Sequence, residues 1–344
     1  MAGECDAAYL AGWRPFFHAV ASVAELDTPR LDEFGRQQPL AVELLGQRLV
    51  LARLNDQLVA MDGTCPHRGA GLHIGWIADD HSAVVCRYHG AEWCANGALR
   101  SLPAMSVAGH QAPDWRIGSY QVQERFGLIW VCLDEQGARL PLLEFPEADD
   151  PDFVQIPISA ETWNAGVGRM IEAALDTYHF AFTHRGTIGD PNDPRAPRPD
   201  VHNDDGVLCI EYDVEQLPNP GIVPHDGEIT GSVRVRYRMT ATPNAVRLVK
   251  QSDAGEYVIY LTSAPLGLRR SRWYRMVARN HDKETPSSVY TESEDAINRQ
   301  DQLVVESMLP WQSPTELDDE KHVVMDRPTV AYRRWLNSLG MRHT

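Results

Sequence analysis

Three side chains near the middle of the chain have types and spacing suited to metal binding: Asp176, His179 and His184, in the pattern D-x-x-H-x4-H. On a helix, residues three apart share a face, so Asp176 and His179 should be neighbours. His184 lies about 140° further around an ideal helix. Both imidazoles therefore reach one metal ion only if the helix loosens or ends between them, and Gly186 can end a helix here. With a carboxylate from elsewhere, the two imidazoles would form a facial triad for iron. The alternative is a buried amphipathic helix with two incidental histidines.

A second set of candidate ligands lies upstream in the pattern C-x-H-x18-C-x2-H: Cys65, His67, Cys86 and His89. Two thiolates and two imidazoles are the ligands of a Rieske-type [2Fe–2S] cluster, in which the histidines raise the reduction potential. The same ligands would also suit a structural zinc ion. Each loop places a cysteine before a histidine, and nearby glycines leave room for backbone amides to approach bridging sulfides. These features favour the iron–sulfur cluster over zinc.

Taken together, the two motifs resemble those of a known family. TCPHRGAGLHIG and VVCRYHGAEW are similar to the two cluster loops of Rieske proteins. EAALDTYHFAFTHRGTIGD is similar to the mononuclear-iron segment of Rieske non-haem iron oxygenases. The resemblance runs from about Trp13 to the end of the chain, and the length is typical of short terminal oxygenase (alpha) components of the vanillate/dicamba O-demethylase type. It implies two cofactors, a [2Fe–2S] Rieske cluster on the first ligand set and a mononuclear Fe(II) on His179 and His184.

The third iron ligand is expected from a second helix, over residues 292–310. Its candidate carboxylates are Glu294, Asp295, Asp301 and Glu306. The stretch that begins at Asp301 resembles the family pattern in which an aspartate ligand precedes two apolar residues and a glutamate. Asp301 is therefore the predicted ligand, with Asp295 as the second choice.

The resemblance also implies a role for Asp176. In the family, subunits form a ring, and an aspartate bridges a cluster histidine of one subunit to an iron histidine of the next. The matching positions here are His89, Asp176 and His179, and the ring expected for this chain length is a homotrimer. A bridging carboxylate would orient both imidazoles. The alternative is that Asp176 only caps a helix or packs.

Composition narrows the classes of function. The chain has 344 residues, a formal charge of −16 and an isoelectric point near 5.2. It therefore lacks the excess of basic residues that is typical of a nucleic-acid-binding protein. No apolar run is long enough to span a membrane, and MAGECDAAYL is not a signal peptide, so a cytoplasmic location is predicted. The cysteines outside the cluster motif have no disulfide spacing, which is typical of free thiols in a reducing compartment: Cys5, Cys94, Cys132 and Cys209.

The elements that must position these ligands divide into two domains. Residues 1–12 form an N-terminal segment, 13–137 a Rieske domain of short strands, and 138–344 a catalytic domain that opens with a Pro- and Asp-rich connector over 138–160. Within the catalytic domain, SVRVRYRM (residues 232–239) alternates apolar residues with an arginine row. That row would bind a carboxylate substrate or acidic partner, or be a solvated, ion-paired face. The resemblance implies an α+β protein, an all-β Rieske domain followed by a helix-grip domain of antiparallel sheet and helices.

The function implied is that of a terminal oxygenase. It would use O2 and electrons from a separate NAD(P)H-dependent reductase, with or without a ferredoxin, to hydroxylate or oxidatively demethylate a small, aromatic-type substrate as a monooxygenase. One alternative is a cis-dihydroxylating aromatic-ring dioxygenase of the same fold. Another is a Rieske electron carrier or zinc-stapled binding protein without oxygenase chemistry, which the second motif argues against. No flavin or nicotinamide fingerprint is present, since Gly166-x-Gly168 lacks the third glycine.

Overall fold

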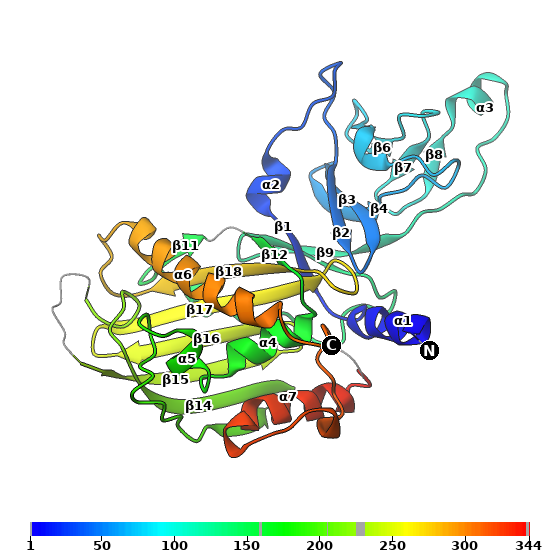
Figure 1. The fold of residues 1–344 in the computed structure, drawn as a ribbon. Helices are drawn as coiled ribbons and strands as arrows, with labels where there is room; N and C mark the ends of the chain where they lie inside the picture. The colour runs from blue at the N-terminus through cyan, green and yellow to red at the C-terminus, as the bar shows by residue number, and fades with distance from the viewer. Residues whose placement is uncertain (1, 158–159, 205, 225–230, 342–343) are drawn as a thin grey trace. The chain divides into compact units, whose positions relative to one another are not determined.

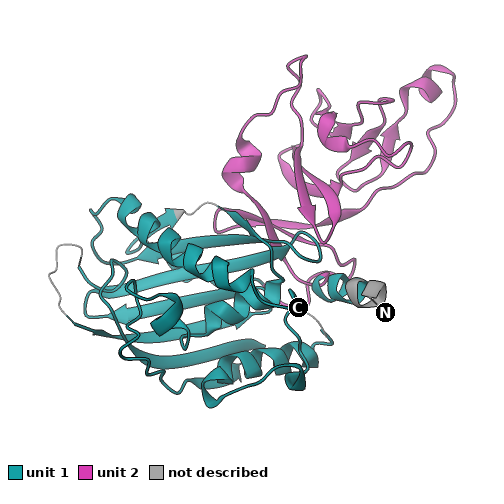
Figure 2. Cartoon of the chain, in the orientation of Figure 1, with its two compact units in different colours: residues 1–13, 142–344 teal, residues 14–141 magenta. Residues whose placement is uncertain are grey.

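A computed structural model describes residues 2–157, 160–204, 206–224, 231–341 and 344. The chain divides into two compact units, residues 14–141 and residues 142–344 together with the N-terminal residues up to Trp13 (Figure 2). The N-terminal segment, for which the sequence predicted no element, is helix α1 (Ala2–Trp13). Its residues Tyr9 and Trp13 are buried, so α1 packs as part of the larger unit.

The smaller unit consists of two antiparallel sheets joined by loops. One has the strand order β1-β10-β9-β4-β3-β2 and the other β5-β6-β7-β8. The short strands predicted for this part of the chain are confirmed. Residues Asn55 and Asp56 form the tight turn between β3 and β4 with positive φ, as a two-residue hairpin turn requires. The strands are β1 (His18–Ser22), β2 (Leu40–Leu44), β3 (Gln47–Leu54), β4 (Gln57–Asp62), β5 (Trp76–Ile77), β6 (Ala83–Val85), β7 (Glu92–Cys94), β8 (Leu99–Ser101), β9 (Ser119–Arg125) and β10 (Leu128–Cys132); short helices are α2 (Val23–Asp27) and α3 (Pro103–Val107).

The larger unit is built on an antiparallel sheet with the order β11-β18-β17-β16-β15-β14-β13, with β12 also paired to β18. Strand β11 lies inside the predicted connector over 138–160, and it pairs Val154 with Arg279. It was missed because a four-residue strand between prolines has too little periodicity to recognise. The strands are β11 (Val154–Pro157), β12 (Glu161–Trp163), β13 (Asp200–Asp204), β14 (Val207–Gln216), β15 (Val233–Thr242), β16 (Ala245–Ser252), β17 (Gly255–Pro265) and β18 (Ser271–Arg279).

Helices α4 (Val167–Leu175) and α6 (Ser287–Val305) lie over one face of this sheet, with α5 (Phe180–Thr183) beside them (Figure 1). Helix α4 contacts strands β16 and β17 as well as α6 and α7 (Arg327–Ser338). Its apolar residues recur at helical spacing and are buried, which fixes α4 between the sheet and the other helices: Val167, Met170, Ile171 and Leu175. The α+β class and the sheet-plus-helices architecture predicted from the sequence are confirmed.

The predicted alternation in β15 is also confirmed. Val235, Tyr237 and Met239 are buried, and the intervening arginines point to the other face. Arg234 and Arg236 both pair with Asp213 on β14, and Arg238 pairs with Glu256 on β17. The arginine row is therefore an ion-paired face, the second of the two alternatives drawn from the sequence.

A buried ionic network joins α4 to α7. The Arg333 guanidinium donates to both carboxylate oxygens of Glu172, at 2.6 and 2.9 Å, and to Glu320 at 2.6 Å. Arg169 donates to Glu320 at 2.7 Å, and the Ser313 hydroxyl donates to Glu172. The network holds α4 in place near the end that carries the metal-site residues.

Two expectations from composition can be compared with the fold. No helix in the described ranges is long and apolar enough to cross a membrane. Cys94, Cys132 and Cys209 are free thiols, as predicted, and the side chain of Cys5 lies outside the described residues.

Candidate metal centres and substrate pocket

The predicted single helix over the D-x-x-H-x4-H motif is instead two helices. Helix α4 ends at Leu175, and Asp176 follows it with extended backbone. The Asp176 carboxylate accepts the backbone N–H groups of Tyr178 and His179, at 2.7 and 3.2 Å. This local turn competes with helix continuation, as aspartate side chains often do. The break therefore comes before His179 and not between the two histidines, where a shared metal ion was expected to require it.

The short helix α5 then spans the two histidines. His179 is its N-cap and His184 its C-cap, and the backbone N–H of His184 donates to the carbonyl of Phe180 at 3.1 Å. Gly186 follows with a φ of 78°, which ends the helix as predicted. The Nε2 atoms of the two imidazoles point to one place, although the histidines lie at opposite ends of this helical turn.

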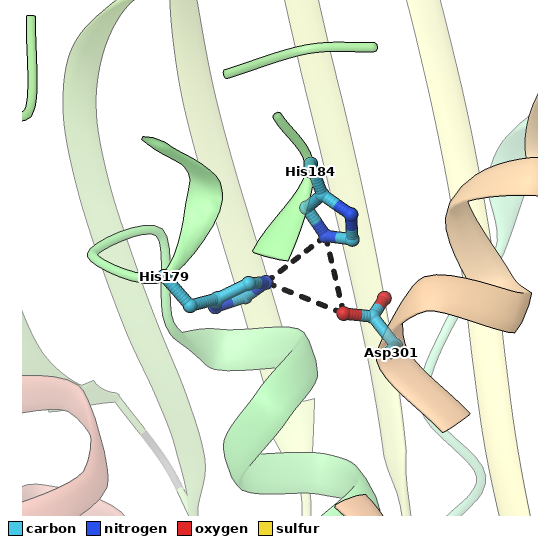
Figure 3. A group of neighbouring side chains, drawn as sticks. All are labelled: His179, His184 and Asp301. Carbon is cyan, nitrogen blue, oxygen red and sulfur yellow. Dashed lines mark hydrogen bonds and ion pairs between the residues drawn. The ribbon is translucent and has the colours of Figure 1, made fainter. Parts of the chain in front are cut away.

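Asp301 of α6 completes this group (Figure 3). The two imidazole Nε2 atoms are 3.1 Å apart, and Asp301 Oδ1 lies 3.4 Å from His179 Nε2 and 3.1 Å from His184 Nε2. All three ligand atoms lie within 4.8 Å of one another. Two imidazole nitrogens and one carboxylate oxygen, facing one point from one side, are the donor set of a facial triad. The residues therefore fit a mononuclear iron ion.

The other candidate carboxylates on α6 have different partners. Asp295 accepts a hydrogen bond from Arg275 at 2.5 Å, and Glu294 accepts one from the Tyr257 hydroxyl at 3.1 Å. Glu306, the C-cap of α6, accepts the backbone N–H of Asn164. Among the four carboxylates that the sequence offered, the described structure brings Asp301 alone to the histidines.

The second ring nitrogen of each histidine has a fixed partner. His179 Nδ1 lies 2.9 Å from Asp176 Oδ2, and His184 Nδ1 lies 2.9 Å from Gln300 Oε1. An N–H at Nδ1 leaves Nε2 of each ring free to bind a metal ion. Gln300 was not predicted, because an amide next to Asp301 in a helix carries no sequence signal of its own.

The carboxylates of Asp176 and Asp301 favour a positive charge between the two histidines and Asp301. Burial lowers the pKa of His179, but hydrogen bonds with Asp176 and Asp301 outweigh burial and raise it to about 9. Burial raises the pKa of Asp301, and the hydrogen bonds with His179 and His184 reverse this and lower it. A divalent cation bound by these residues would likewise be stabilised by the two carboxylates.

The two cluster loops of the smaller unit have the same backbone geometry. Cys65 N–H donates to Ala70 O at 2.8 Å and Gly69 N–H to Cys65 O at 3.0 Å; Cys86 and Gly90 repeat this pattern at 2.8 and 2.9 Å. Both glycines have positive φ, of 74° and 69°, which favours glycine at these positions. The equivalent loops present equivalent ligands.

The loops place the thiols and the imidazoles in separate pairs. Cys65 and Cys86 are buried, and a hydrogen bond between the thiols lowers the pKa of Cys86 to about 6 and raises that of Cys65. The ring centroids of His67 and His89 are 4.5 Å apart, and His89 is exposed. In the described structure no three of these ligand atoms lie within 4.8 Å of one another, as one tetrahedral zinc ion would require. A buried cysteine pair and an outer histidine pair fit the two irons of a Rieske cluster.

A cavity with about 640 Å³ of empty space, partly open to solvent, adjoins the triad in the larger unit. Its walls are mainly apolar and come from the sheet and the helices: Trp163, Phe180, Leu248, Ile259, Leu261 and Ile297. Lys250, Arg275, Glu294 and Asn298 add polar groups, and of these the sequence had singled out Glu294 alone, as a candidate iron ligand. The arrangement can hold a small, largely apolar molecule beside a metal ion.

Comparisons with known proteins agree with this arrangement. Residues 25–120 match the Rieske [2Fe-2S] domain, and residues 163–342 match the vanillate O-demethylase oxygenase C-terminal domain. Methylxanthine N1-demethylase NdmA from Pseudomonas putida is 31% identical over 96% of this chain and 90% of that protein. Methylxanthine N3-demethylase NdmB from the same organism is 29% identical over 98% of this chain and 91% of that protein.

Solved structures show the same fold. Pseudomonas putida NdmA with caffeine superposes with a TM-score of 0.81 at 28% identity, over 96% of this chain and 92% of that chain. Dicamba monooxygenase bound to dicamba has a TM-score of 0.73 at 18% identity, over 95% of this chain and 97% of that chain, which supports the fold alone.

The predicted family, fold class, enzyme class and pair of cofactors are thus confirmed. Oxygenases of this family act on small molecules with O2 and receive electrons from separate partner proteins. The Rieske domain, the matched catalytic domain and the whole-length relatives together show that the chain is an oxidoreductase that belongs to the Rieske non-haem iron terminal oxygenases.

Proposed function

We propose that this chain is a monooxygenase that removes a methyl group from a nitrogen or oxygen atom of a small, planar, aromatic-type molecule. The observation that carries the proposal is an apolar cavity that opens onto the His179–His184–Asp301 group. Two relatives that match over 96% and 98% of this chain are N-demethylases. An apolar pocket with few polar groups suits a planar ring and leaves a methyl group to face the metal.

We assign seven side chains to the metals. His179, His184 and Asp301 would hold the mononuclear iron, and Cys65, His67, Cys86 and His89 the cluster. When bound, these groups supply O2 activation and the electrons for it. The protein's own residues hold the substrate, exclude water and fix the imidazoles. Asp176 and Gln300 orient the rings by accepting hydrogen bonds at Nδ1 of His179 and His184.

Asp176 has a second proposed role. We infer a homotrimer in which the Asp176 carboxylate also accepts a hydrogen bond from His89 of a neighbouring subunit. Its side chain is 27% exposed beside His179, so one edge remains accessible to a partner.

The electron donors we propose are an NAD(P)H-dependent reductase, with or without a ferredoxin. Unpaired cysteines support a cytoplasmic location.

The reaction is tested by following the methyl group and the oxygen atoms. Oxidative demethylation consumes O2, two electrons and two protons, and gives the demethylated molecule, formaldehyde and water. With labelled O2, formaldehyde should appear in step with O2 uptake, with methoxy- or N-methyl-arenes as substrates. A ring diol that carries two labelled oxygen atoms would instead identify a dioxygenase.

The ligand assignment has its own test, by metal analysis. Asp301→Ala should lose the mononuclear iron and keep the cluster spectrum. Asp295→Ala is the matched control on the same helix, since Asp295 pairs with Arg275 rather than with the histidines. Loss of iron in the control with retention in Asp301→Ala would overturn the assignment.

A further inference from the structure

Lys250 is a charged residue in the middle of the apolar wall of the cavity. It lies on β16, where it pairs across the sheet with Tyr237 on β15 and Tyr257 on β17. Its ammonium nitrogen is 5.8 and 5.6 Å from the centroids of these two rings, and the residue is 4% exposed. Leu248, two residues earlier on the same face, also lines the cavity. The lysine stem therefore packs between tyrosines, and its head group faces the cavity.

The ammonium group has no hydrogen-bond acceptor among the residues that the structure describes. Its side chain makes no hydrogen bond and no ion pair within 4.0 Å with any residue in the described ranges. The guanidinium group of Arg275, the other cationic side chain of the cavity, already has acceptors, since it donates hydrogen bonds to the backbone carbonyl of Glu294 and to the carboxylate of Asp295. Burial of a cation without an acceptor is costly, and the two tyrosine faces offset only part of that cost. Lys250 is thus ready to donate hydrogen bonds to a molecule in the cavity.

The cavity also contains a buried carboxylate. Glu294 lines the same cavity, is 5% exposed, and accepts one hydrogen bond, from the Tyr257 hydroxyl. A carboxylate has room for further donors. Burial lowers the pKa of Lys250, and the charges of Glu294 and Asp301 act in the opposite direction. The cavity therefore presents a donor and an acceptor of opposite charge with no direct ion pair between them.

This pair of charges discriminates among substrates. An anionic carboxylate would be attracted by Lys250 and repelled by Glu294. A neutral group that carries a C=O beside an N–H satisfies both: the carbonyl accepts from Lys250, and the N–H donates to Glu294. A ring with neither group leaves both charges buried without partners.

We propose that Lys250, with Glu294, is the specificity-determining pair of the cavity, and that it selects neutral amide-, lactam- or imide-bearing rings over carboxylates. This inference rests on the demethylase proposed above for the same cavity. It concerns binding, so it can be tested separately from turnover.

The test measures ligand binding by calorimetry under anaerobic conditions, with the full-length protein loaded with its metals. The probes share one ring and one methyl group: 3-methoxybenzamide, 3-methoxybenzoate and methoxybenzene. The amide should bind most tightly. Lys250→Met keeps the stem between the tyrosines and removes the charge, and it should weaken amide binding by about 10- to 100-fold while leaving methoxybenzene unchanged. Glu294→Gln should strengthen benzoate binding.

Controls separate a specific role from a structural one. Lys283→Met, at an exposed lysine paired with Asp152, should leave all three affinities unchanged. Lys250→Met should unfold at the same temperature as the parent or higher, because it removes a buried charge. The inference is overturned if benzoate binds more tightly than the amide, if no amide binding is measurable, or if Lys250→Met binds the amide as the parent does. If Lys250-dependent amide binding occurs without formaldehyde release, the demethylase proposal fails and the binding inference stands.

Discussion

The ionic network between α4 and α7 allows a quantitative test of what holds the catalytic unit together. Arg333→Met keeps the apolar stem and removes the guanidinium. The lost contacts are two hydrogen bonds to Glu172 and one to Glu320, from an arginine side chain that is 2% exposed. The removal of one partner of a buried ion pair costs about 3–5 kcal/mol.

The remaining contacts place the expected cost at the lower end of that range. After the substitution, Glu172 keeps the Ser313 hydroxyl, and Arg169 lies 3.8 Å away as an alternative cation. We therefore expect a loss of about 3 kcal/mol in the free energy of unfolding. For a unit of this size that corresponds to a fall in Tm of about 6–12 °C.

Urea unfolding followed by circular dichroism measures the free energy, and calorimetry measures Tm. Arg234→Met is the matched control in the same unit, since Arg234 forms an exposed pair with Asp213 and its side chain is 72% exposed. Exposed pairs of this kind contribute at most about 1 kcal/mol. The double variant Arg333→Met/Glu172→Leu should be less destabilised than the sum of the two single variants, because no unpaired carboxylate stays buried. A loss below about 1 kcal/mol for Arg333→Met, or additive effects in the double variant, would refute the reasoning.

Three further outcomes are expected. The purified protein should be red-brown and should contain about two cluster irons, two acid-labile sulfides and one further iron per chain. The Cys86→Ala variant should lose the colour. Zinc in place of iron, without labile sulfide, would contradict the cluster assignment. Asp176→Asn should keep both metal centres and lose turnover. Mixed oligomers of Cys86→Ala and His179→Ala chains should regain activity if electrons pass between subunits. Mixed oligomers as inactive as either parent would favour transfer within one chain. Burial raises the pKa of Glu320, but hydrogen bonds from Arg169 and Arg333 outweigh it and lower the pKa from 4.5 to about 2. The ionised form of Glu320 therefore makes its full contribution to the free energy of unfolding above pH 4.5, and this contribution is lost as the pH falls toward 2. Between these pH values, Tm should fall less steeply with falling pH in Glu320→Gln than in the parent.

The sequence allowed prediction of features that depend on short spacings. The proposed cluster ligands lie within two loops, and the hairpins around them follow from turn residues and alternation. Asp301 could be chosen from four carboxylates because its local pattern resembled the family's. The proximity of Asp176 and His179 was predicted for the wrong reason, since an aspartate turn produces it rather than a continuous helix.

Features that depend on contacts between distant segments were not predictable. Gln300 acts on His184 from another helix, and its role follows from a 2.9 Å contact across 116 residues of sequence. Lys250 follows Val246 and Leu248 on the buried face of β16. The alternation of the strand could have shown from the sequence that this lysine lies on the apolar face. A signal of that kind shows burial but does not show that the cavity lies in front of the ammonium group.

An iron ion held by the proposed His179–His184–Asp301 group would act as a cross-link in the chain. His179 and His184 flank a single helical turn, so coordination by these two residues alone would close only a very short loop. Asp301 follows His184 by 117 residues, a segment that contains strands β13 to β18 and most of α6. A covalent cross-link over a loop of about 100 residues would remove unfolded-state entropy worth about 4.7 kcal/mol at room temperature. Metal loss should therefore release α5 from α6 and make the long intervening segment easier to unfold and digest, even where the sheet itself is intact.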